Sequence, residues 1–382
     1  MHRYLIHSSH LTWLAVAVLL LAGCGTSTTR PLAQVTATPT PTLVPPTTPT
    51  TPTTSPGAQP NLTITTFPLG IQGSVSSITA GPDGNLWFTS FAQSQADDSF
   101  TAATVGRVTM AGAITRFPLP TTNGTPSSIT AGPDGSLWFV ERAGNKIGRI
   151  TTSGTVTEFS LPTTSGQTNT ALFGIASGAD GNLWFTWLRV GSSLDQAQIG
   201  RITPSGAITA FPLVLPFDAV EDITSGPDGN LWFTVGGACT EPCHRPAIGR
   251  ITASGAITDF TFSGDSSSPY HITPGPDGNL WFAGAYGNTV FSMIGRITPG
   301  GRITVFPLPC ANPQTSDCLG ADGIMAGPDG ALWFAAGQTT LGRSTTTGTI
   351  TEYHAALSGP LAIGPDGKLW VGGSDEVGRV VL

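Results

Sequence analysis

Gly81-Pro82-Asp83-Gly84-Asn85-Leu86-Trp87-Phe88-Thr89 decides the fold, because six close copies of this stretch follow it along the chain. The copies begin at Gly132, Gly178, Gly226, Gly275, Gly327 and Gly364. Their tryptophans are separated by 51, 46, 48, 49, 52 and 37 residues. A repeat of roughly 40–50 residues predicts an array of similar structural units, and this inference precedes any assignment of function.

Each copy predicts a hairpin turn between two strands. In Pro-Asp-Gly, proline presets φ, the aspartate side chain bonds back to the backbone, and glycine takes the left-handed conformation. The flanking strands are expected at 77–80 and 85–89. A third run such as Ile147–Thr151 and a fourth such as 113–119 complete each repeat. The sequence therefore predicts an all-β, seven-bladed β-propeller built from four-stranded antiparallel blades.

The two ends of the repeat region complement each other. The last repeat stops after its third strand, at residues 376–382, whereas a strand of the fourth type, residues 62–69, precedes the first repeat. An unpaired strand edge is a liability that a closed ring removes. We therefore predict that residues 62–69 pair with the C-terminal blade and close the propeller.

Residues 1–23 predict a lipoprotein signal peptide. Arg3 precedes an apolar run at 11–23 that is too short to span a membrane. The run ends in Leu21-Ala22-Gly23-Cys24, which resembles the bacterial lipobox, where cleavage precedes a cysteine that then carries lipid. We expect an extracytoplasmic protein held at the cell membrane only by the lipid on Cys24. An ordinary secretory signal with a chance cysteine is the alternative.

The lipidated cysteine opens a tether, residues 24–60, and the tether leads to one domain at 61–382. From Thr36 to Pro60 the chain is mostly threonine and proline, which cannot bury a core and favour extended polyproline II. The predicted tether is therefore disordered. The domain supplies about 46 residues to each blade, a length at which propellers form a single unit.

Charge and cysteine content limit the partners and the compartment. The net charge is −7 and no basic stripe occurs, which argues against a nucleic-acid partner. Cys239, Cys243, Cys310 and Cys318 form an even set, as expected for disulfides outside the cytoplasm. Local pairing within each loop is the simplest of three connectivities, and a zinc site that includes His244 is the alternative. We expect a monomer whose partner is a small molecule or a component of the cell surface.

Long loop insertions are expected at residues 90–104, 187–198, 235–247, 284–293 and 309–321. They lie on one face of the predicted propeller and mark it as the binding face. A residue that recurs in every blade belongs to the scaffold, so candidate site residues are those that break the sevenfold pattern near the axis. The alternative interpretation is that these residues form only a polar rim around a solvent-filled funnel. The expected ligand-binding residues are Glu141, Phe173, Trp187, Glu221, Asp222, Tyr270, His271 and Asp322.

The repeats resemble those of the virginiamycin B lyase family, the streptogramin-inactivating seven-bladed propellers. The resemblance covers 62–382 and is clearest in residues 128–162, SITAGPDGSLWFVERAGNKIGRITTSGTVTEFSLP. It implies a seven-bladed propeller that opens the streptogramin ring by magnesium-dependent elimination rather than by hydrolysis. It further implies histidine and glutamate near the first strands of the last two blades.

The sequence departs from the family at these positions. Asp322 stands at the histidine place of the sixth blade, and Gly359 and Leu361 stand at the glutamate and histidine places of the seventh. Asp322, His271 and Glu221 are therefore the candidate catalytic residues for any reaction at this mouth, because a proton transfer requires an acid or a base.

Three functions follow from these observations. The first is a binding module for a small ligand or partner at the variable-loop face, with no cofactor. The second is a magnesium-dependent carbon–oxygen lyase of the streptogramin lyase type or a related lactonase-like enzyme, with magnesium implied by the resemblance. The third is a structural or interaction role.

Overall fold

The computed structural model describes most of the predicted domain. The described residues are 61–70, 73–93, 100–121, 124–162, 167–191, 196–213, 219–236, 246–262, 268–286, 291–308, 321–337 and 339–382. The predicted signal peptide, the tether and all five cysteines lie outside these ranges. Within them, no helix has the length and apolar character needed to cross a membrane.

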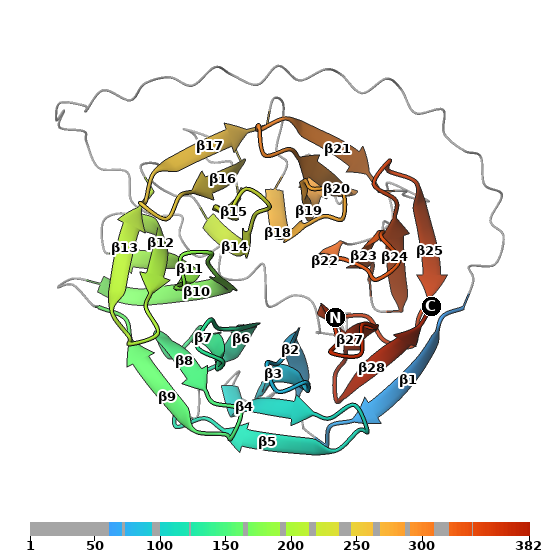
Figure 1. Ribbon diagram of the computed structural model, residues 1–382, viewed down its shortest axis with the longest axis horizontal. Coiled ribbons are helices and arrows are strands. Elements are labelled where there is room, and N and C mark those ends of the chain that lie inside the picture. The colour runs from blue at the N-terminus through green and yellow to red at the C-terminus, as the bar shows by residue number, and fades with distance from the viewer. Residues whose placement is uncertain are drawn as a thin grey trace, which may run out of the picture. The chain divides into compact units, whose positions relative to one another are not determined.

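The described residues form seven four-stranded antiparallel sheets around a central axis, which confirms the predicted fold (Figure 1). Blade one contains β2 (Ser74–Ala80), β3 (Leu86–Gln93), β4 (Phe100–Val108) and β5 (Ile114–Pro118). Blade two contains β6 (Pro126–Ala131), β7 (Leu137–Glu141), β8 (Lys146–Ile150) and β9 (Val156–Ser160). Blade three contains β10 (Gln167–Ser177), β11 (Leu183–Gly191), β12 (Gln196–Ile202) and β13 (Ile208–Pro212).

The remaining blades repeat this order. Blade four contains β14 (Ala219–Ser225), β15 (Leu231–Gly236), β16 (Ala247–Ile251) and β17 (Ile257–Thr261). Blade five contains β18 (Ser268–Pro274), β19 (Leu280–Tyr286), β20 (Phe291–Ile297) and β21 (Ile303–Pro307). Blade six contains β22 (Asp322–Ala326), β23 (Leu332–Ala335), β24 (Thr340–Ser344) and β25 (Ile350–His354). Blade seven contains β26 (Leu361–Ile363), β27 (Leu369–Gly372), β28 (Glu376–Val381) and β1 (Thr63–Pro68).

The predicted ring closure is confirmed by the pairing of β1 with β28. The two strands run antiparallel, with Thr63 opposite Val381 and Pro68 opposite Glu376. The backbone N–H of Leu62 also donates to the carbonyl of the last residue of β25, at 3.0 Å. The strand β1 thus completes the last blade (Figure 1).

The repeated turn holds the repeated tryptophan. The N–H of Gly81 donates to the carbonyl of Asn85 at 2.7 Å, and Gly84 adopts a φ of 72° that favours glycine. Asp83 Oδ1 accepts a hydrogen bond from Trp87 Nε1 at 2.9 Å. Burial opposes ionisation of Asp83, but hydrogen bonds from Asn85 and Trp87 outweigh it and lower the pKa of the carboxyl. The turn therefore anchors an indole as well as reversing the chain.

The repeated tryptophan and arginine join neighbouring blades. The Trp87 ring stacks on Phe117 with centroids 5.5 Å apart, and it packs in one apolar cluster with Phe139 of blade two. The Arg107 guanidinium lies over the Trp87 ring at 5.7 Å and donates to the carbonyl of Thr152 in blade two at 3.1 Å. These contacts confirm that residues present in every blade build the scaffold.

Three of the predicted loop insertions begin as longer strands. Residues 90–104, 187–198 and 284–293 were expected to be loops, yet β3 and β4 remain paired out to Gln93 and Phe100. The hairpins β11–β12 and β19–β20 are extended in the same way. Additional backbone pairing satisfies polar groups that a loop would leave to water, so the strands continue past the expected ends.

Candidate functional site

The first strand of each blade lies nearest the centre of the ring (Figure 1), and in blades one to six it carries a bulge at one shared place. A bulge bends a strand and re-aims its side chains. In blades three, four and five, the bulge presents Phe173 and Gly174, Glu221 and Asp222, and Tyr270 and His271. In blades one and two the same places hold serine pairs.

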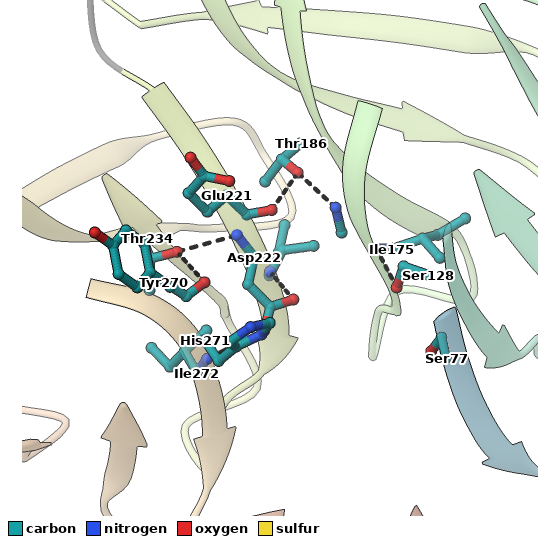
Figure 2. Close-up of polar contacts among 12 residues, drawn as sticks. Ser77, Ser128, Ile175, Thr186, Glu221, Asp222, Thr234, Tyr270, His271 and Ile272 are labelled. Atoms are coloured by element: carbon teal, nitrogen blue, oxygen red, sulfur yellow. Dashed lines mark hydrogen bonds and ion pairs between the residues drawn. The ribbon is translucent and has the colours of Figure 1, made fainter. Parts of the chain in front are cut away.

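Threonines from the second strands lock these bulges together, as Figure 2 shows. Thr186 Oγ1 accepts from the N–H of Gly174 at 2.8 Å and donates to the carbonyl of Glu221 in the next blade at 3.0 Å. Thr234 Oγ1 accepts from the N–H of Asp222 at 3.0 Å and donates to the carbonyl of Tyr270 at 3.2 Å. The positions of the site side chains are therefore fixed through the backbone of adjacent blades.

Asp222 is engaged mainly by backbone donors. Its Oδ1 accepts from the N–H of Ile223 at 2.8 Å, and its Oδ2 accepts from the N–H of Ile272 in blade five at 3.1 Å. The same Oδ2 lies 3.6 Å from Nδ1 of His271 (Figure 2). The carboxylate thus supports the bulges of two blades and faces the imidazole.

The need for this carboxylate follows from a missing side chain. Ser77 accepts from the N–H of Ile129 at 3.4 Å, and Ser128 accepts from the N–H of Ile175 at 3.3 Å. Each serine thereby satisfies a bulge in the next blade. Gly174 at the equivalent place has no side chain to offer. The carboxylate of Asp222 compensates for that loss.

Glu221 has the more reactive environment of the two acids. Burial raises the pKa of its carboxyl to about 7, while Arg142 and His271 oppose the rise and Asp222 adds to it. A carboxyl with this pKa exchanges a proton at neutral pH. Groups of this kind concentrate at functional sites.

Arg142 is the site residue that the sequence did not reveal. It follows the last residue of β7, and its guanidinium lies over the Phe173 ring at 4.6 Å from the centroid. Burial lowers the pKa of Arg142, and the charge of Glu221 counteracts that effect. The available signal was its place directly after Trp-Phe-x-Glu, where the other blades carry no arginine.

We define the axial cluster as six side chains that these contacts bring together. Tyr270 is 39% exposed and the His271 side chain is 43% exposed, so the blade-five part of the cluster faces solvent. Glu221, Asp222 and Phe173 are partly buried. The members of the axial cluster are Arg142, Phe173, Glu221, Asp222, Tyr270 and His271.

Trp187 does not line the mouth as expected. It is fully buried in a cluster with Leu172 and Phe185, because β11 continues through it and pairs it with Leu172 and Gln198. The guanidinium of Arg189 lies over its ring at 4.6 Å. The extended hairpin turns the indole into the blade, away from any ligand at the axis.

Glu141 is also buried rather than open to a ligand. It is 0% exposed at the end of β7, and neither carboxyl oxygen has a hydrogen-bond partner in the described part of the chain. Burial and the charge of Glu158 raise its pKa to about 8, whereas Lys146 opposes the rise. The carboxyl is therefore protonated at neutral pH.

The backbone of Asp322 lies on the first strand of blade six. It is the first residue of β22, at the register place that Glu221 holds in blade four, and its side chain lies outside the described part. Among the side chains that are described, no three histidine, cysteine, aspartate or glutamate residues come together to hold a metal ion. Gly359 and Leu361 offer no ligating side chain, so this donor set does not fit magnesium at the places implied by the resemblance.

A separate hollow of about 290 Å³ lies in blade one, away from the axial cluster. Its lining includes Ser90, Phe91, Thr104 and Arg116. The guanidinium of Arg116 already donates to the carbonyl of Gly70 at 2.7 Å. Glu221, the carboxyl whose pKa burial raises to about 7, belongs to the axial cluster, so the axial cluster is the stronger candidate.

The fold and the cluster define a seven-bladed propeller with a site that breaks its sevenfold repetition at the axis. The family model for the virginiamycin B lyase family matches residues 57–172 and 166–382. The chain belongs to the virginiamycin B lyase family.

Similarity to curated relatives is local in sequence. The chain is 41% identical over 70 residues to the virginiamycin B lyase of Bordetella parapertussis and 40% identical over 70 residues to that of Bordetella bronchiseptica. Each alignment covers 18% of this chain and 20% of the relative, so the chain spans about a fifth of the length of these curated relatives.

Similarity to solved structures extends over the propeller. A streptogramin B lyase structure aligns with a TM-score of 0.68 and 29% identity, over 84% of this chain and 98% of that one. The virginiamycin B lyase of Staphylococcus aureus aligns with a TM-score of 0.67 and 32% identity, over 84% of this chain and 100% of that one. A catalytically inactive variant of the same enzyme, crystallised with quinupristin, aligns equally well.

Proposed function

We propose that this chain is a lipid-anchored extracytoplasmic protein whose propeller binds a small ligand at the axial cluster. One observation carries the proposal: Phe173, Glu221 and Tyr270 occupy the same register place on three adjacent blades. Blades one and two hold serine at that place. A departure from repetition on consecutive blades, with half-exposed Tyr270 at its edge, is what a ligand site on a rigid frame requires.

The anchor is supported by the order of segments in the leader. A short apolar run ends in the lipobox-like Leu21-Ala22-Gly23-Cys24, and a threonine- and proline-rich tether follows it. Twenty-five residues of extended polyproline II, from Thr36 to Pro60, reach at most about 80 Å. Such a tether would hold the propeller clear of the membrane. Labelling with a fatty acid analogue tests this, with labelling expected in the wild type and lost in Cys24→Ser.

The binding proposal is tested on the mature chain carrying Cys24→Ser, so that it stays soluble. Thermal melting is followed with amines, carboxylates, sugars, peptides and cell-wall fragments. A ligand at about 100 times its dissociation constant stabilises the folded state by about 2.7 kcal/mol. The shift should shrink in Tyr270→Leu and Glu221→Gln and persist in Ser127→Ala, the matched place in blade two. If a ligand raises the melting temperature equally in the wild type and in all three variants, it binds elsewhere and the proposed site is wrong.

A carbon–oxygen lyase of the streptogramin type is the second candidate. The observation in its favour is Glu221, whose pKa is about 7 and on which the charge of His271 acts, together with the His271 imidazole 3.6 Å from Asp222. Elimination needs a base at a C–H bond and an acid at the leaving oxygen, and both groups can serve at neutral pH. Quinupristin cleavage is the assay. Ring opening by elimination leaves the mass unchanged and shifts the retention time, whereas hydrolysis adds one water.

A further inference from the structure

The axial cluster arranges an acid between two aromatic rings. Phe173, Glu221 and Tyr270 stand at one register place of β10, β14 and β18, and adjacent blades place them in that order around the axis. Figure 2 shows the Glu221 carboxyl and the Asp222 carboxyl leaving opposite sides of β14. Aromatic faces beside a carboxylate are the chemistry that recognises organic cations.

A cation of the protein already occupies one side of this arrangement. The Arg142 guanidinium lies 4.6 Å from the centroid of Phe173, and its charge acts on Glu221. The aromatic face and the acid together therefore accept a guanidinium in the folded chain. The Tyr270 ring on the other side of Glu221 is 39% exposed.

The charges of the cluster leave room for a second cation. Glu221 and Asp222 are two carboxyls, and Arg142 is the one permanent cation among the six cluster residues. Asp222 is held by two backbone N–H groups, which fixes its place but adds no positive charge. The raised pKa of Glu221 agrees with this account, because burial disfavours the negative charge and a bound proton neutralises it.

We infer that the axial cluster takes a cationic group of its ligand, an alkylammonium or a guanidinium, between the Glu221 carboxylate and the Tyr270 ring. The inference rests on the proposed function and names the chemistry of the ligand. The bound cation replaces the proton on Glu221, so binding releases a proton. Affinity should rise by about tenfold from pH 6 to pH 8, because only the ionised carboxylate pairs with the cation.

The test uses benzyltrimethylammonium, whose charge does not change with pH, with benzyl alcohol and benzoate as neutral and anionic counterparts. Ligand-observed NMR and calorimetry on the mature Cys24→Ser chain give the affinities at pH 6 and pH 8. The cation should bind best, lose at least tenfold in Glu221→Gln, and lose its pH dependence there. Glu221→Asp keeps the charge and should keep part of the binding. Tyr270→Leu should also weaken binding, and Ser127→Ala should not.

Each outcome decides between the two proposals. If benzoate binds in an Arg142-dependent and Tyr270-dependent manner and the cation does not, the cation inference is overturned while the site stands. If no probe responds to Glu221→Gln or Tyr270→Leu, both the inference and the site are overturned. Unchanged thermal melting of the variants without ligand shows that the losses come from the site rather than from the fold.

Discussion

Replacing Glu141 with glutamine should make the propeller more stable at alkaline pH and change its stability little near pH 5. The carboxyl lies against Gly124, between β5 of blade one and β6 of blade two, and it is fully buried without a hydrogen-bond partner among the described residues. Its titratable neighbours are Glu158 on β9 and Lys146 on β8, which form an ion pair at 2.5 Å. Lys146 is therefore already engaged when Glu141 ionises.

The magnitude follows from the pKa of Glu141. Burial, reinforced by Glu158, raises it from 4.5 to about 8 in the folded chain. Below pH 4.5 both states hold the proton, and the free energy of unfolding is unaffected. Between pH 4.5 and about 8 only the unfolded chain releases it, so stability falls by about 1.4 kcal/mol per pH unit. The accumulated loss is at most about 5 kcal/mol and stays constant above pH 8, and glutamine removes it.

Urea unfolding of the wild type and Glu141→Gln at each unit from pH 5 to pH 9 measures this difference. The two curves should lie within about 1 kcal/mol of each other at pH 5 and separate progressively up to pH 8. Glu158→Gln is the matched contrast. Burial opposes ionisation of Glu158, but hydrogen bonds from Lys146 and Thr121 dominate and lower its pKa, so this variant should destabilise at neutral pH. Parallel curves for wild type and Glu141→Gln would refute the buried, protonated carboxyl.

Three further predictions concern the scaffold. Deleting residues 61–69 removes the closing strand and should abolish cooperative thermal unfolding; an unchanged melting transition would contradict this. Asp222→Ala leaves two backbone N–H groups without their acceptor and should lower the free energy of unfolding in urea by about 2–4 kcal/mol. A negligible change would show that water replaces the carboxylate as acceptor. Gly249→Ala places a methyl group into the Phe233 ring and should cost at least about 2 kcal/mol, and Phe233→Leu should relieve part of that loss in a double-mutant cycle.

The fold could be predicted from the sequence because the motif that builds the scaffold occurs seven times. Each copy of the turn carries its own glycine, aspartate and tryptophan, so a local error in one copy cannot mislead the assignment. The closing strand was predictable for the same reason, since 62–69 matches the fourth strand that the last repeat lacks. Comparing the seven repeats with one another identifies the scaffold residues without a second sequence.

Single-copy features were harder to predict, because each depends on tertiary geometry that no repeat reports. Trp187 was expected at the mouth, but β11 continues through that residue, pairs it with Gln198 of β12 and buries it. In a strand, a shift of one position reverses the face to which a side chain points. Arg142 was missed because its long side chain reaches Phe173 in the next blade, a contact that spacing along the chain does not encode.

Asp222 shows that some residues that depart from the repeat support the scaffold, and that these should be separated from residues that are candidates for function. It was expected to bind ligand, yet its carboxylate satisfies bulges that serine satisfies in the first two blades and that Gly174 cannot. One departure from the repeat, the glycine, thus explains a second, the aspartate. Glu221 and Tyr270 stand at the place that serine fills in blades one and two. The function is therefore best sought in the irregular residues that remain after the scaffold has been satisfied.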